Sequence, residues 1–169
     1  MERNSGILLH PTSLTDTPIC GTFGKPARVW LNDLAKYGIG VWQFLPLAPP
    51  DSLGSPYSSP SSFAFNPWFL DENDLVRDGF LSDDLENFYS EIEIFDERVD
   101  FKLADSKVKF LISSLVDYWE RQNATIKEEF YSWCEKQFWL EDHSIFMELR
   151  FQNNNLPWWK WPEKICCLR

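Results

Sequence analysis

The sequence predicts an α/β fold in which two parallel strands are followed by a series of helices. Three observations support this prediction: two short apolar runs that each end at a proline, an amphipathic helical pattern between them, and helical periodicity without a further strand in the second half of the 169 residues. A spacing of about 30 residues is typical of a βαβ unit, which has parallel strands and a right-handed crossover. Two strands do not complete an α/β domain, so we expect an unfinished sheet.

The first two strands and the helix between them follow from local patterns. Residues 5–10 form a short apolar run whose length suits a buried strand. Pro26 suits the first residue of a helix, and Gly38 provides a stop at its C-terminal end. Residues 41–45 form the second apolar run. The apolar positions that recur at helical spacing between the runs are Ala27, Trp30, Leu31 and Leu34.

A long loop follows the second predicted strand. Residues 46–67 are dense in Pro, Ser and Gly and show no periodicity, yet they carry Tyr57, Phe63 and Phe65. Loops of this length are either disordered or functional, and the aromatic side chains favour an ordered loop that packs on the domain. In parallel α/β folds, ligands bind at the loops that follow the strands. The alternative is an ordered surface loop that binds nothing.

Helix signals dominate the rest of the chain. Ser82 with the acids that follow it predicts one helix start, and Asp100 predicts the cap of a second helix. Thr125 and Glu128 match a capping box. A last helix is predicted over residues 139–151. Ala104, Val108, Leu111, Leu115 and Tyr118 form the expected apolar face after Asp100, whereas Ile126, Phe130 and Trp133 are expected to point inward after Thr125.

Composition excludes several classes of function. The net charge is −10, with 26 acidic and 16 basic side chains, so nucleic acid and anionic membranes are poor partners. The sequence shows no secretory leader and no apolar stretch of membrane-spanning length, which predicts a cytoplasmic protein. The four cysteines lack metal-binding spacing, and we expect reduced thiols, no metal and no cofactor. Aromatic residues make up 17% of the chain, and they either build the core or line a sugar-binding cleft.

Adjacent acids are the first candidates for catalytic carboxylates. They occur at Asp71–Glu72, Asp83–Asp84 and Glu141–Asp142. Neighbours along a helix do not face one another, so we interpret these acids as solvated or helix-capping groups and assign none of them to catalysis.

Four short sequence motifs, taken in their order along the chain, indicate a protein family. The segments are GILLHPTSL at residues 6–14, VWQFLPL at 41–47, SPYSS at 55–59 and FAFNP at 63–67. Together they resemble the opening of the amylomaltase family of 4-alpha-glucanotransferases. The resemblance implies an incomplete (β/α)8 TIM barrel, with the first two strands and the substrate loop in residues 1–71 and an α-helical insertion in residues 72–169.

The family resemblance implies an activity and its partners. Family members transfer α-1,4-glucan segments between maltooligosaccharides, or to glucose as acceptor, with retention of configuration. They use an Asp nucleophile, a Glu acid/base and a second Asp, all from later barrel strands, and a complete barrel needs about 250 residues. We therefore expect the catalytic residues beyond Arg169, a truncated reading frame and an inactive fragment. The alternatives are a non-catalytic glucan-binding or scaffold piece completed by a partner chain, and a starch-hydrolysing amylase.

The resemblance also implies which residues contact substrate. Tyr57, preceded by Ser55 and Pro56, matches a family tyrosine at the sugar-binding cleft, where its ring can stack on glucose; the alternative is a loop anchor. His10 ends the first strand and either faces the pocket or has a structural role.

Other matched positions are interpreted as structural, and two segments depart from the family pattern. Asn66 and Asp71 are expected to fix the loop, and Trp42 to lie in the barrel core. Residues 51–54 replace the Gly-Tyr-Gly-Asp of many relatives, which removes an aromatic that could touch a longer glucan. Residues 15–16 replace a Pro-Gly pair, which alters the first turn.

Overall fold

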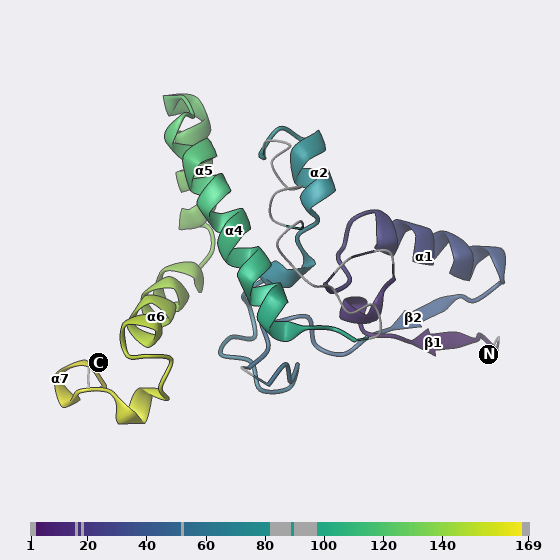
Figure 1. The fold of residues 1–169 in the computed structure, drawn as a ribbon, viewed down its shortest axis with the longest axis horizontal. Coiled ribbons are helices and arrows are strands. Elements are labelled where there is room, and N and C mark those ends of the chain that lie inside the picture. Colours follow the sequence, from purple (N-terminus) through teal and green to yellow (C-terminus); the bar gives the residue numbers. More distant parts are fainter. Residues whose placement is uncertain are drawn as a thin grey trace. The chain divides into compact units, whose positions relative to one another are not determined.

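The computed structural model describes residues 3–15, 17, 19–51, 53–81, 89 and 98–166 (Figure 1). They form two compact units, Met1–Gln122 and Asn123–Arg169, each of which is described by itself. The predicted boundary between residues 71 and 72 concerns where a barrel gives way to an insertion, and it stays a prediction.

The N-terminal unit begins with the predicted βαβ unit. Strand β1 (Gly6–Leu8) pairs in parallel with β2 (Val41–Gln43), with Ile7 opposite Trp42, and helix α1 (Lys25–Lys36) connects them. Helix α1 begins one residue before Pro26, which was predicted to start it, and Gly38 follows the helix with a φ of 70°, a value that favours glycine. The strands, helix and parallel pairing are therefore confirmed, although each strand has only three residues and is shorter than predicted. The prediction that the first strand is buried is wrong, because no further strand or layer among the described residues covers its second face.

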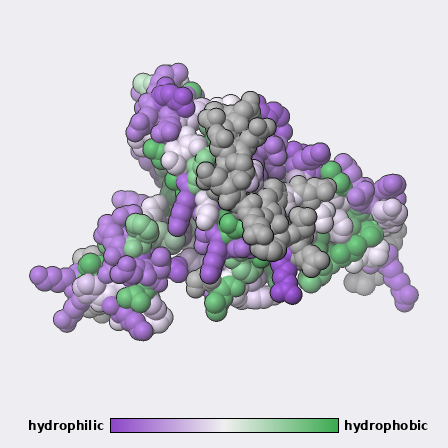
Figure 2. Space-filling view, in the orientation of Figure 1, coloured by the Kyte–Doolittle hydropathy of each residue, from purple (hydrophilic) through white to green (hydrophobic). Residues whose placement is uncertain are grey.

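The two faces of the strand pair differ in burial. Ile7 and Trp42 are half-buried, and the Trp42 ring lies edge-on to Trp30 of α1, with a centroid distance of 6.4 Å. The Trp42 indole N–H donates to the Leu9 carbonyl at 2.8 Å. Trp42 therefore packs between strand and helix, and not on the opposite face that would line the interior of a barrel, where it was expected. On the opposite face, Leu8 is 58% and Val41 is 46% exposed, and the surface view shows hydrophobic side chains in the region of the strand pair (Figure 2).

The core of this unit lies on helix α4 (Phe101–Glu120). Its cap is Asp100, as predicted, whose carboxylate accepts from the backbone N–H groups of Lys102 and Leu103. Helix α4 packs against the 3-10 helix η2 (Pro67–Phe69), which contacts η1 (Pro11–Ser13). The buried cluster at this junction contains Ile19, Cys20, Trp68, Ala104 and Val108. Helix α2 (Glu72–Arg77) follows η2, while the helix start predicted at Ser82 lies outside the described residues.

The predicted apolar face of α4 is confirmed over its first half. Ala104, Val108 and Leu111 are buried, whereas Leu115 and Tyr118 are half-buried. The burial of this face therefore decreases toward the C-terminal end of the helix.

The C-terminal unit consists of α5 (Ala124–Glu135), α6 (Leu140–Gln152), η3 (Trp158–Lys160) and α7 (Glu163–Cys166). The helix predicted over 139–151 is confirmed to within one residue. The capping box at Thr125 is wrong, because Asn123 is the cap and its amide oxygen accepts from the Ile126 N–H at 3.1 Å. The predicted inward face of α5 is also wrong. Ile126, Phe130 and Trp133 are 38%, 46% and 44% exposed, because a unit this short has little interior.

Candidate functional site

The loop that follows β2 is organised by its own hydrogen bonds. The Asp51 carboxylate accepts from the backbone N–H groups of Leu53 and Ser55, both at 2.9 Å, and the Gly54 N–H donates to the Asp51 carbonyl at 3.0 Å. Further along, the Ser61 hydroxyl oxygen accepts from the N–H groups of Phe63 and Ala64. These bonds define two turns, in agreement with the prediction of an ordered loop. The expectation that the loop's aromatic residues pack on the domain is wrong, because hydrogen bonds within the loop order it while Tyr57, Phe63 and Phe65 are exposed.

Tyr57 projects from this loop. Its side chain is 73% exposed, and a turn closed by the Ser58 N–H on the Ser55 carbonyl at 3.3 Å surrounds it. Phe63 and Phe65 are also exposed. The loop thus presents aromatic residues on the surface of this chain, and Tyr57 is among them.

A cavity of about 180 Å³ lies behind the loop. It brings His10 and Pro56 together, whereas Ser55 and Tyr57 lie outside its lining. The other lining residues are Thr12, Leu45, Ala48, Pro50, Gly54, Asn66, Trp68 and Phe101. This lining is mostly apolar and contains no carboxylate.

His10 is held by two polar contacts at the edge of this cavity. Its Nε2 lies 3.4 Å from the Pro46 carbonyl oxygen, and its Nδ1 lies 2.8 Å from the Thr12 hydroxyl. A carbonyl can only accept, so Nε2 carries the proton and a neutral ring accepts the Thr12 hydroxyl proton at Nδ1. Burial lowers the pKa of His10, although the Pro46 carbonyl opposes this shift. Near pH 7 the ring is therefore neutral.

Asn66 and Asp71 have the structural roles expected of them. The Asn66 amide oxygen accepts from the Trp68 N–H and caps η2, and the Asp71 carboxylate accepts from the Asp74 N–H and caps α2. The Thr22 hydroxyl donates to the other Asp71 oxygen at 2.5 Å. A Cβ at Gly24 would overlap the Asp71 side chain, so a glycine is required where these two segments meet. The end of the loop is thereby fixed to the turn that precedes α1.

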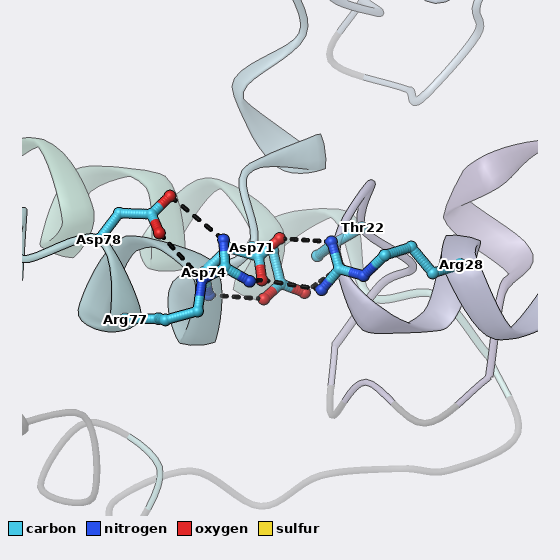
Figure 3. Close-up of polar contacts among 6 residues, drawn as sticks. All are labelled: Thr22, Arg28, Asp71, Asp74, Arg77 and Asp78. Carbon is cyan, nitrogen blue, oxygen red and sulfur yellow. Dashed lines mark hydrogen bonds and ion pairs between the residues drawn. The ribbon is translucent and has the colours of Figure 1, made fainter.

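An ion-pair ladder continues from Asp71 along α2 (Figure 3). Arg28 of α1 makes a two-pronged contact with Asp74, both distances being 2.8 Å, and Arg77 contacts Asp74 at 2.6 Å and Asp78 at 2.9 Å. The hydrogen bonds from Arg28 hold the pKa of Asp74 below its usual value. Asp74 thus joins α1 to α2, whereas Asp78 is paired with Arg77 at the end of α2.

The sequence interpretation missed a buried ion pair. Glu72, expected to be a solvated or capping acid, is only 4% exposed, and one of its oxygens lies 3.4 Å from the ammonium of Lys107, which is 2% exposed. The Tyr89 hydroxyl donates to the other oxygen. Burial and the nearby Glu72 charge raise the pKa of Tyr89. The available signal was Lys107 itself, because it lies beside Val108 on the buried face of α4.

The other acids and cysteines have simpler surroundings. Glu141 and Asp142 are exposed in the first turn of α6, as expected, while Asp83 and Asp84 lie outside the described residues. Cys20 and Cys134 carry free thiols, and burial raises the pKa of Cys20. Over the part of the chain that the structure describes, no group of His, Cys, Asp or Glu could hold a metal ion. Nor is any described helix long and apolar enough to cross a membrane.

Comparisons with known proteins give a solved structure with the same fold and then the family. The amylomaltase of Streptococcus agalactiae, solved in complex with acarbose, superposes with a TM-score of 0.85 at 27% identity over 96% of this chain. The sequence model of the 4-alpha-glucanotransferase family matches residues 9–168. The chain therefore belongs to the 4-alpha-glucanotransferase family.

Individual relatives agree with this assignment. The 4-alpha-glucanotransferase of Thermus thermophilus is 35% identical over 96% of this chain, and that of Synechocystis is 34% identical over 97%. The chain spans 32% of the length of each of these relatives and of the solved amylomaltase.

Proposed function

We propose that this chain forms the first two strands and an α-helical insertion of a (β/α)8 barrel that acts as a 4-alpha-glucanotransferase. The whole protein transfers α-1,4-glucan segments between maltooligosaccharides, or to glucose, in the cytoplasm and with retention of configuration. The observation that carries the proposal is the family match over residues 9–168 in a chain whose parallel strands lead into a loop with an exposed tyrosine.

The chain's own part in this reaction is to bind and orient sugar. The exposed face of Tyr57 offers a flat surface for the C–H face of a glucose unit, and its hydroxyl can bond to a sugar hydroxyl. Ser55 and Pro56 set the path of the chain before Tyr57. His10, neutral and with Nε2 directed at Pro46, stands at the cavity behind them and supports the loop.

The bond-breaking groups are proposed to come from outside this chain. Retention requires two carboxyl groups about 5–5.5 Å apart on either side of the scissile bond. The acids that cluster near the loop's end, namely Asp71, Asp74 and Asp78, are held by caps and arginines, and Glu72 is buried against Lys107. We therefore propose that the isolated chain is inactive.

The experiment joins the 169 residues to the remaining segment of the Thermus thermophilus relative, and this product is called the joined enzyme. With maltotriose we expect glucose together with maltooligosaccharides longer than the substrate, measured by chromatography of the products. The isolated chain and the isolated remaining segment, each tested alone, should give none.

Three outcomes would change the proposal. Glucose and maltose without longer products would indicate an amylase. Products from the isolated chain would show that it carries its own catalytic groups. A folded but inactive joined enzyme, combined with maltotriose binding by the isolated chain, would favour the non-catalytic glucan-binding piece.

A further inference from the structure

An aromatic ring from outside the loop packs against the turn that precedes Tyr57. Gly54 has a φ of 79°, in the left-handed region that side chains disfavour. A Cβ at this position would also overlap the Phe101 ring, since it would lie 2.5 Å from the ring's Cζ atom. The loop backbone at Gly54 therefore lies directly on Phe101, which is distant in sequence.

Phe101 is held firmly on its other side. It is the first residue of α4, directly after the capping residue Asp100. Its ring stacks on Trp68 with a centroid distance of 5.3 Å and an interplanar angle of 14°. The Trp68 indole N–H in turn donates to Asp105 of α4 at 2.9 Å. The helix, the Trp68 ring and the Phe101 ring thus form one packed support beneath Gly54.

This support meets the turn that the Asp51 carboxylate organises. The two N–H groups that Asp51 accepts from belong to Leu53 and Ser55, the residues on either side of Gly54. Tyr57 follows Ser55 by two residues, and the Ser58 N–H bonds back to Ser55. A shift of Gly54 would therefore change the direction in which the chain enters the Tyr57 turn.

We propose that Phe101 is a positioning residue for Tyr57, which it orients by holding the Gly54 turn against α4. The consequence for ligands rests on the proposed function, in which Tyr57 contacts an α-1,4-glucan. A loop already fixed by α4 loses little conformational freedom when sugar binds, so the affinity of the loop for sugar is higher than that of a loose loop.

The test is hydrogen–deuterium exchange by mass spectrometry on the joined enzyme, in which the remaining segment completes the sheet. Phe101→Ala should speed exchange in peptides covering residues 51–58 by roughly fivefold. Without the ring, local opening of the turn no longer costs the free energy of breaking the contact with Phe101. Peptides covering α2 should exchange at the unaltered rate. Phe101→Leu, which keeps an apolar side chain beneath Gly54, should restore most of the protection, and Gly54→Ala should loosen the same peptides.

Ile112→Ala provides the matched control, because Ile112 is an apolar residue of the same helix that is 50% exposed. It should leave exchange of residues 51–58 unchanged. The proposal is overturned if Phe101→Ala leaves these peptides unaltered, or if exchange rises equally in the loop and in α2, which would indicate a general loss of stability.

Maltotriose separates this proposal from the proposed function. In the unaltered joined enzyme it should slow exchange of residues 51–58, and Phe101→Ala should raise the maltotriose concentration needed for this effect by roughly threefold to tenfold. If maltotriose protects nothing in the unaltered joined enzyme, the loop loses its role in glucan binding. The contact between Phe101 and Gly54 is decided independently by the exchange rates without sugar.

Discussion

At the scale of single residues, Tyr57 combines an exposed side chain with an ordered backbone. The residue is 73% exposed, while the turns around it are closed by backbone and side-chain hydrogen bonds. Exposure alone does not distinguish Tyr57 from other surface aromatic residues. Its place in an ordered loop leaves the ring available to a ligand in a defined position, as the proposed function requires.

Replacement of this ring should therefore affect activity more than stability. In the joined enzyme, Tyr57→Ala should lower the initial rate of glucose release from maltotriose roughly tenfold, because a stacking contact of about 1 kcal/mol or slightly more is lost. The melting temperature should stay nearly unchanged, since an exposed loop residue contributes little to packing.

The control for this variant is Tyr37→Ala at the end of α1. Tyr37 is 72% exposed, which matches Tyr57 closely, and it lies outside the loop. Its removal should change neither the rate nor the melting temperature. An unchanged rate for Tyr57→Ala would remove Tyr57 from the site, and a large drop in melting temperature would make it a loop anchor.

At the scale of helices and strands, the sequence predicted the helix ends that are determined by residues within one turn. Pro26, Gly38 and Asp100 act within one helical turn, so the sequence alone located the helix ends that they mark. Two acceptable caps near α5 competed, and Asn123 was overlooked because the Thr125 pattern also fits a capping box. A local sequence pattern therefore does not decide which of two neighbouring residues caps a helix.

Long-range contacts were beyond sequence reasoning. The pairing of Glu72 with Lys107 and the contact of Phe101 with Gly54 each join residues that are far apart in the chain. Nothing in the spacing of these residues indicates that they meet. Only the packing of α4 against η2 and the loop brings them together.

The buried ion pair should make α4 sensitive to loss of one partner. Lys107→Met leaves the Glu72 carboxylate buried without its ammonium, which should cost about 3–5 kcal/mol of folding free energy and lower the melting temperature of the joined enzyme by several degrees. The double variant Lys107→Met with Glu72→Gln should recover part of this loss, because no unpaired charge remains.

Lys109→Met is the matched control on the same helix, since Lys109 is exposed and Lys107 is buried. It should leave the melting temperature unchanged. Equal melting temperatures for Lys107→Met and Lys109→Met would show that the Glu72–Lys107 pair contributes nothing to the stability of the fold.

At the scale of the whole molecule, the strand pair exposes a surface that an α/β sheet normally covers. Leu8 and Val41 lie on the face opposite α1, and the pair forms a sheet of only two strands among the described residues. Parallel sheets in α/β proteins are covered on both faces, and open strand edges favour association with other chains. The fold of this chain alone therefore leaves apolar surface in water.

The isolated 169-residue chain should consequently bind the dye ANS and associate in solution despite its net charge of −10. Leu8→Lys should reduce both effects, because a charge on the open strand face disfavours contact between apolar surfaces. Leu31→Lys on α1 is the control, since Leu31 is 51% exposed but lies on the helix and away from the strand face. Dye fluorescence and light scattering after size-exclusion chromatography measure the two effects. A monodisperse monomer with a sharp cooperative thermal transition and no dye binding would contradict this prediction, because it would mean that the exposed strand face carries no cost.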